Sequence, residues 1–244
     1  MPVPVTLLPL CSDLPSAMYS HFAPLFDRAA VVLTVTESER QVVSDSYPSK
    51  DVVAVGPPLA ANPSVWREPN PYLGENDYLV VLTDAPLAST AYTSNLARLV
   101  RLAFPYQRVA IVATDAFDVW LRGNVVRSAP ITRGSDLLRL MAWARTTIDL
   151  APGSLVARRC VESLLYATPI LVPEGSKAHE HARLGCGGLW FETSDELVRC
   201  VDAVLDSNTA EELGKQGQGY AESKYGSTQS FIRQVSSVVE ATTR

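Results

Sequence analysis

Short apolar runs recur along the chain and are separated by stretches in which apolar residues have helical spacing. Runs of Val, Ile and Leu at successive positions are typical of parallel strands that are covered on both faces. The alternation of such strands with helices predicts an α/β sheet with right-handed crossovers. The predicted strands lie at residues 5–8, 31–35, 52–55, 78–83, 108–113, 124–127, 147–150, 170–172 and 189–191.

A proline-rich segment divides this pattern. Residues 57–74 contain five prolines and show no periodicity, which predicts a linker. Three strands precede the linker, in residues 1–56, and are too few for an independent sheet domain. Six strands follow it, which is enough for a complete doubly wound domain over residues 75–226.

The C-terminal part of the chain has the spacing of three helices. Residues 195–206 place their apolar side chains on one side. Asn208, with Glu211 three residues later, has the spacing of a capping box and predicts the start of a second helix. Ser227 is predicted to begin the third helix, which we assign separately as residues 227–244.

Composition excludes several classes of protein. The 244 residues are 47% hydrophobic and 19% charged, which excludes a disordered chain. A net charge of −5 argues against a general nucleic-acid binder. No apolar run approaches the roughly 18–20 residues of a membrane span, and the N-terminus lacks the features of a signal peptide. The four cysteines have no zinc spacing, so we expect reduced, mostly buried thiols and a cytoplasmic location.

Residues 147–173 are the most informative segment, because they predict strand, tight turn, helix, turn and strand. Gly153 in the turn lets a ligand approach the backbone closely, and Ser154 is the expected N-cap. The free N–H groups at the helix start favour a phosphate, and open α/β sheets bind ligands at this edge. The helix is expected to bury one face, formed by Ala157, Cys160, Val161, Leu164 and Leu165.

Glu162 lies away from this buried face and has two interpretations. It can form an ion pair with Arg158, four residues earlier, on a solvated helix face. It can also accept hydrogen bonds from sugar hydroxyls.

The sequence His179–Glu180–His181 suggests a metal site only at first sight. Residues i and i+2 do not share a helix face, and a metal site needs more ligands than these. We therefore expect a surface turn and no bound metal.

Residues 151–173, APGSLVARRCVESLLYATPILVP, resemble the nucleotide-binding segment of the retaining GT-B-fold glycosyltransferases of the group 1, or family 4, kind. In that family the segment contains E-x7-E and ends in a G-x-P-V turn. Glu162 occupies the second Glu position, and residues 167–171 match the turn. Residues 179–191 and 194–225 resemble the stretches that follow in the family, and residues 26–40 resemble the end of its N-terminal domain.

The resemblance implies a GT-B C-terminal domain with a doubly wound, Rossmann-like parallel sheet, a remnant of the N-terminal domain at residues 1–56, and C-terminal helices. It implies transfer of a sugar from a nucleotide-diphosphate donor to an unknown acceptor, without metal or cofactor. Retaining enzymes of this fold use the donor's own phosphate, so no general base is assigned. Glu162 would hold the ribose hydroxyls, and residues 129–133 would pack near the base. The implied donor-binding residues are Gly153, Ser154, Leu155, Val156, Arg158 and Glu162.

Three departures from the family favour an alternative function. Ser154 stands where the family has the first Glu, and a hydroxyl cannot replace a carboxylate in polarising a donor sugar. The loop at residues 83–90 contains Asp84 and none of the cations that hold the donor diphosphate in the family. Most of the acceptor-binding half is also absent from this sequence, so either another chain supplies it, or the sequence is a fragment, or the chain works without it. The alternative is a catalytically degenerate half that binds or regulates another glycosyltransferase chain, or a second copy of itself. A nucleotide-sugar epimerase or hydrolase on the same fold is a third and weaker interpretation.

Overall fold

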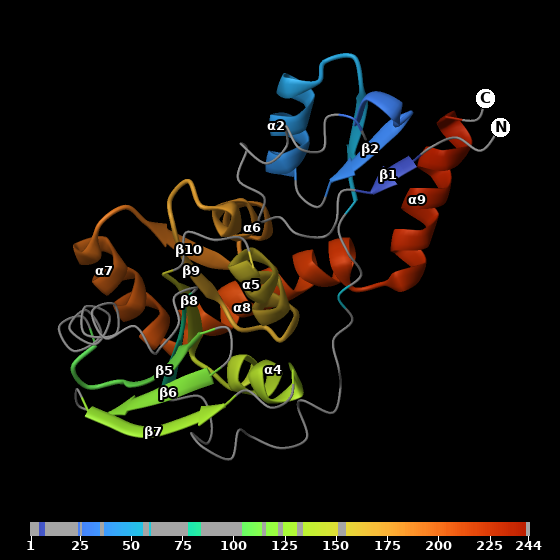
Figure 1. Cartoon of the computed structure of the whole chain (residues 1–244). Coiled ribbons are helices and arrows are strands. Elements are labelled where there is room, and N and C mark those ends of the chain that lie inside the picture. The colour runs from blue at the N-terminus through green and yellow to red at the C-terminus, as the bar shows by residue number, and fades with distance from the viewer. Residues whose placement is uncertain are drawn as a thin grey trace. The chain divides into compact units, whose positions relative to one another are not determined.

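The structure is a computed structural model, and it describes residues 5–7, 24, 26–34, 37–55, 59, 78–83, 104–113, 116–121, 124–130, 134–150 and 155–242. The chain divides into two compact units. The small unit comprises Met1–Ala60 and Glu222–Arg244, and the large unit comprises Ala61–Ala221 (Figure 1). Most of the predicted linker at residues 57–74 lies outside the described residues.

The small unit contains a parallel three-stranded sheet in the order β1-β2-β3, which consists of β1 (Val5–Leu7), β2 (Val31–Thr34) and β3 (Asp51–Ala54). Helix α2 (Glu37–Ser46) connects β2 to β3. Both faces of β2 are covered, because successive side chains of a strand point to opposite faces. Val32 packs with Phe26, Ala29 and Val43.

The other face of β2 is covered by the C-terminal helix α9 (Thr228–Thr242). Val31 and Leu33 pack there with Val55 and with an apolar stripe of the helix, formed by Phe231, Val235 and Val238. The backbone N–H of Leu59 also donates to the carbonyl of Tyr225. The two ends of the sequence therefore form one core, an association over about 200 residues of sequence that no local pattern indicates.

The large unit is built on a seven-stranded sheet in the order β10-β9-β8-β4-β5-β6-β7. Pairing is parallel from β10 to β5 and antiparallel from β5 to β7. The strands are β4 (Tyr78–Leu82), β5 (Arg108–Val112), β6 (Ala116–Leu121), β7 (Asn124–Pro130), β8 (Thr146–Asp149), β9 (Ile170–Pro173) and β10 (Gly188–Phe191).

Helices cover both faces of this sheet, as in a doubly wound fold. Leu79 and Ile148 belong to the core on one face, where α7 (Ser194–Leu205) packs. On the other face, Tyr78 donates a hydrogen bond of 2.6 Å to the carbonyl of Leu140 in α4 (Gly134–Ala142). Helices α5 (Leu155–Leu165) and α6 (Lys177–Gly185) follow β8 and β9, and α8 (Ser207–Tyr225) follows α7.

All nine predicted strands are present, and the structure adds one strand that was not predicted, β6. The interpretation of residues 124–127 as a parallel strand is wrong, because β7 forms an antiparallel hairpin with β6. Asp118 interrupts the apolar pattern of β6 and is nevertheless 8% exposed. A register shift between Val119 and Trp120 also breaks the strict alternation that identifies a strand.

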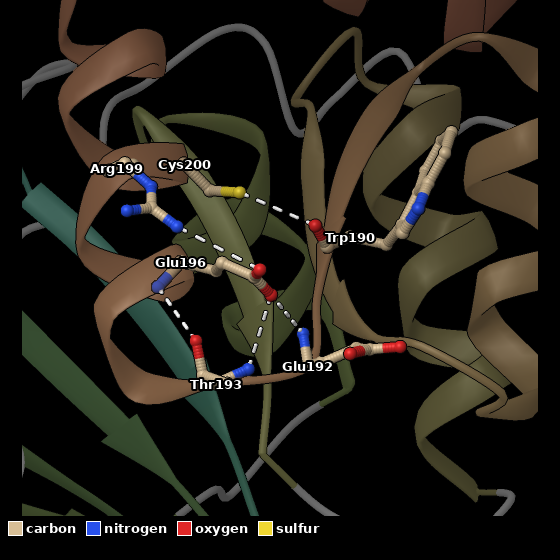
Figure 2. A network of polar contacts seen from close by, with 6 residues as sticks. All are labelled: Trp190, Glu192, Thr193, Glu196, Arg199 and Cys200. Carbon is tan, nitrogen blue, oxygen red and sulfur yellow. Dashed lines mark hydrogen bonds and ion pairs between the residues drawn. The ribbon is translucent and has the colours of Figure 1, made fainter.

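The capping box lies at the start of α7 and not, as predicted, at the start of α8. The Thr193 hydroxyl accepts from the Glu196 N–H at 3.2 Å, and the Glu196 carboxylate accepts from the N–H groups of Thr193 and Glu192 (Figure 2). Helix α8 begins at Ser207, and the Asp206 carboxylate accepts from the N–H and hydroxyl of Thr209. The predicted capping residue Glu211 instead pairs with Lys215.

Removal of the Thr193 hydroxyl is expected to destabilise the large unit. Thr193→Ala leaves the Glu196 N–H without its acceptor and should lower the free energy of unfolding by about 1 kcal/mol. Urea denaturation measures the change, and Thr193→Ser, which keeps an acceptor, should recover most of it. Equal stability of the alanine variant and the wild type would contradict this interpretation.

Helix α8 approaches α5 through glycines. An alanine Cβ at Gly217 would lie 2.5 Å from Leu164 Cδ2, and one at Gly187 would lie 2.8 Å from the same atom. A Cβ at Gly214 would overlap the carbonyl oxygen of Ala167, in the turn after α5. The spaced glycines therefore permit close packing of α8, which holds the C-terminal end of α5 in place.

Candidate functional site

Helix α5 begins beyond the carboxyl end of β8. Strand β8 ends at Asp149, which is buried, and α5 begins at Leu155. The predicted turn, with Gly153 and Ser154, lies outside the described residues, as do the side chains of Leu155 and Val156. The first helical turn of α5 therefore lies at the sheet edge where open α/β folds bind ligands.

The predicted buried face of α5 is confirmed, since all five of its residues are at most 3% exposed. A polar contact fixes the helix on the sheet, because the hydroxyls of Thr147 in β8 and Ser163 in α5 lie 2.7 Å apart. The Thr168 hydroxyl beyond the helix donates to the carbonyl of Met141 at 2.9 Å. The position of α5 relative to β8 and α4 is thus determined by packing and by buried hydrogen bonds.

Glu162 is buried, with only 7% of the residue exposed. Its Oε1 accepts from Arg158 Nε at 2.9 Å, and its Oε2 accepts from an Arg159 terminal nitrogen at 3.0 Å. The predicted pair with Arg158 is confirmed, but the prediction of a solvated helix face is wrong. Arg159 is a second partner that was not predicted, although its spacing of three residues from Glu162 is typical of an ion pair on a helix.

The burial of Glu162 requires this pairing. A carboxylate taken out of water is strongly destabilising unless charged donors replace the lost hydration. The two arginines supply those donors while their own side chains remain 58% and 39% exposed. Two guanidinium groups and one carboxylate leave one positive charge, and the first turn of α5 contains no acidic residue.

The interpretation of residues 179–181 as a surface turn is wrong, because they belong to α6. His181 is 1% exposed, and its Nδ1 lies 3.1 Å from the Tyr220 hydroxyl. His179 Nδ1 accepts from the Gly175 N–H at 3.2 Å, and its ring packs against Trp190. Both histidines thus have structural contacts, and among the described residues no group of three or more His, Cys, Asp or Glu could hold a metal ion.

Three glutamates lie near the carboxyl ends of β9 and β10. The pKa of Glu192 is raised, chiefly by a hydrogen bond with Glu174 and by repulsion from Glu174 and Glu196. The pKa of Glu196 is lowered by the backbone N–H groups of Glu192 and Thr193 that it accepts. Figure 2 shows Glu196 turned toward these N–H groups and toward Arg199. The Oε1 atom of Glu196 lies 3.8 Å from a terminal nitrogen of Arg199.

These opposite shifts predict opposite effects of pH on stability. An acid whose pKa is raised by folding loses stability as the pH rises through that pKa, whereas one whose pKa is lowered gains it. Glu192→Gln should therefore raise the thermal unfolding midpoint at neutral pH, and should have no such effect near about pH 3. Glu196→Gln should lower the midpoint at neutral pH. Thermal unfolding of the two variants at neutral pH and near about pH 3 measures these changes. A shift of the midpoint in the same direction for both variants at neutral pH would contradict the opposite pKa shifts.

Other predicted site segments are only partly described. Thr83 begins the cation-free loop and is buried, and its N–H donates to the carbonyl of Val112 at 2.9 Å. Residues 84–90 lie outside the described residues, as do residues 131–133 of the segment expected near the base. Within the described part of the chain, no helix is both long enough and apolar enough to cross a bilayer.

The chain resembles known proteins in its structure and not in its sequence. No protein-family model matches the chain, and no curated protein sequence matches it significantly. Solved structures do match, with low sequence identity. TarM, a protein of S. aureus, is 11% identical with a TM-score of 0.65, over 91% of this chain and 46% of TarM.

Two further structures agree with this. Anabaena HepE in complex with UDP and glucose is 12% identical with a TM-score of 0.63, over 93% of this chain and 68% of HepE. The pneumococcal O-GlcNAc transferase GtfA, in complex with UDP and GlcNAc, is 10% identical with a TM-score of 0.58, over 92% of this chain and 48% of GtfA. The chain thus spans about half the length of TarM and GtfA. These matches show that the chain has the GT-B glycosyltransferase fold.

Proposed function

We propose that the chain binds a nucleoside-diphosphate sugar and transfers its sugar to an acceptor. The observation that supports this most strongly is the buried carboxylate of Glu162. It lies on the helix that follows β8, at the position that the family resemblance assigns to nucleotide binding. The GT-B fold supports the same function, since HepE and GtfA were solved with UDP and a sugar.

The proposed donor site uses the start of α5. The backbone at Gly153, Ser154, Leu155 and Val156 would face the phosphates, where free N–H groups favour an anion. Glu162 would hold the ribose hydroxyls. Each of its oxygens accepts one hydrogen bond from an arginine and has a second lone pair for a hydroxyl donor. We assign no metal, cofactor or general base to this reaction.

Thermal unfolding with added nucleotides tests the proposal. A ligand that binds only the folded state raises its stability in proportion to the logarithm of the ligand concentration. Millimolar UDP or GDP should raise the unfolding midpoint, whereas the free nucleosides at the same concentration should raise it less. The absence of any shift with both nucleotides would contradict the proposal.

A second candidate function is a catalytically degenerate half that binds another glycosyltransferase-like chain or a second copy of itself. Ser154 in the first carboxylate position and the cation-free loop at residues 83–90 favour it. One further structural match, over 98% of this chain, is the GtfA/B complex. Turnover of a UDP-sugar or GDP-sugar by the purified chain alone would exclude this candidate. Nucleotide binding without turnover, together with a stable complex in solution, would favour it.

A further inference from the structure

Three side chains on α5 form a compact charged cluster, which we call the α5 cluster: Arg158, Arg159 and Glu162. The Glu162 side chain is 9% exposed, whereas the side chains of Arg158 and Arg159 are 58% and 39% exposed. The buried Glu162 carboxylate accepts hydrogen bonds from both guanidinium groups and so restrains their positions. The arginine side chains thus lose much of the conformational freedom that a solvated arginine has.

Arg158 keeps the part of its guanidinium that suits a phosphate. It donates to Glu162 through Nε, so both of its terminal nitrogens remain for another acceptor. Arg159, in contrast, donates to Glu162 through one of its own terminal nitrogens. Among the described residues, Arg158 makes no hydrogen bond other than the one to Glu162. The paired terminal nitrogens of an arginine match the oxygens of a phosphate and bind them bidentately.

Helix α5 contains no acidic residue other than Glu162. The first turn of α5 contains no acidic residue, and the cluster retains one net positive charge. The sequence that follows β4, at residues 83–90, contains Asp84 and neither lysine nor arginine. Residues 83–90 therefore provide no side-chain cation for a diphosphate. The α5 cluster provides one instead, on the helix that follows β8, the parallel neighbour of β4.

We propose that Arg158 binds the diphosphate of the nucleotide donor and that Glu162 is a positioning residue that fixes the Arg158 guanidinium for this contact. Arg159 donates to the second carboxylate oxygen of Glu162 and so helps to hold the carboxylate in place. The inference rests on the proposed donor-binding function, and adds that recognition depends on the phosphates through a side chain of α5.

Substitution of Glu162 distinguishes two effects on anion binding: the positioning of the Arg158 guanidinium and the negative charge of Glu162 itself. Loss of a negative charge beside an anion site should strengthen anion binding if charge alone matters. Glu162→Gln leaves a single oxygen to accept from two arginines, so it releases the fixed geometry. The proposal therefore expects weaker binding of inorganic pyrophosphate by Glu162→Gln, by about fivefold, despite the more positive site.

Titration calorimetry with UDP and with inorganic pyrophosphate tests the role of Arg158. Arg158→Ala should weaken the binding of both ligands by about tenfold or more, because it removes a bidentate charged contact. Arg158→Lys, which keeps the charge and loses the paired nitrogens, should recover only part of the loss. Arg199→Ala is the control, since Arg199 is also a largely exposed arginine, 71% exposed, that pairs with a glutamate on its own helix, in this case Glu196 on α7.

The outcomes distinguish this inference from the function on which it rests. Unchanged binding of both ligands by Arg158→Ala, or equal losses in Arg158→Ala and Arg199→Ala, would overturn it. The absence of pyrophosphate binding to the wild type would also overturn it, as would tighter pyrophosphate binding by Glu162→Gln. If pyrophosphate binds and is lost in Arg158→Ala while UDP binds no better than pyrophosphate, the anion site stands and the nucleotide-binding function fails.

Discussion

Gly214→Ala is expected to lower the free energy of unfolding of the large unit by about 2–4 kcal/mol. The added Cβ would overlap the carbonyl oxygen of Ala167 and lie 3.0 Å from its carbonyl carbon. This backbone cannot move easily, because Ala167 has a left-handed φ of 56°. The next residue, Thr168, donates its N–H to the carbonyl of Ser163 and its hydroxyl to that of Met141. Urea denaturation of the purified chain measures the loss.

Gly219 provides a matched control on the same helix. A Cβ there would meet no atom within 4 Å, so alanine adds only its higher helix propensity. Gly219→Ala should therefore raise the free energy of unfolding by about 0.5–1 kcal/mol. Similar stability of the two variants would show that α8 does not pack on the α5 turn as described.

Glu162→Ala is expected to weaken UDP binding by about a hundredfold or more. The variant loses the acceptor proposed for the ribose hydroxyls and also the carboxylate that holds Arg158 and Arg159. The stability loss should be smaller, about 1–2 kcal/mol, because both arginines are exposed enough to be hydrated once released. Calorimetric titration measures the first effect and urea denaturation the second.

Glu196→Ala is the matched control for this carboxylate. Glu196 also accepts hydrogen bonds and lies near an arginine, but it belongs to the capping box of α7. Its removal should cost stability and leave UDP binding unchanged within about twofold. A parallel loss of binding in both variants would mean that Glu162 acts through the stability of the unit alone.

Much of the sheet could be predicted because its strands are short, apolar and buried on both faces. Such strands stand out against the helical spacing around them, and α5 shows its buried face in the same way. The β6–β7 hairpin could not be recognised from these signals, because Asp118 is a charged residue at a position that the fold buries.

The site was less predictable than the sheet, because the spacing of residues within α5 does not reveal which of its polar residues are buried. The helical spacing of α5 places Glu162 away from the apolar face, and only the three-dimensional packing shows that the carboxylate is buried. The contact between His181 and Tyr220, which are 39 residues apart, has the same origin. Local spacing gives the partners of a side chain within its helix, but it does not give what tertiary packing covers.

Titration calorimetry of UDP into the wild type and into Glu162→Ala, side by side, tests the central claim most directly. We expect saturable binding of UDP, or of GDP if the base is guanine, to the wild type, and loss of this binding in the variant. Absence of saturable binding of either nucleotide to the wild type at millimolar concentration would contradict the account. Undiminished binding by Glu162→Ala would also contradict it, because it would place the nucleotide away from α5.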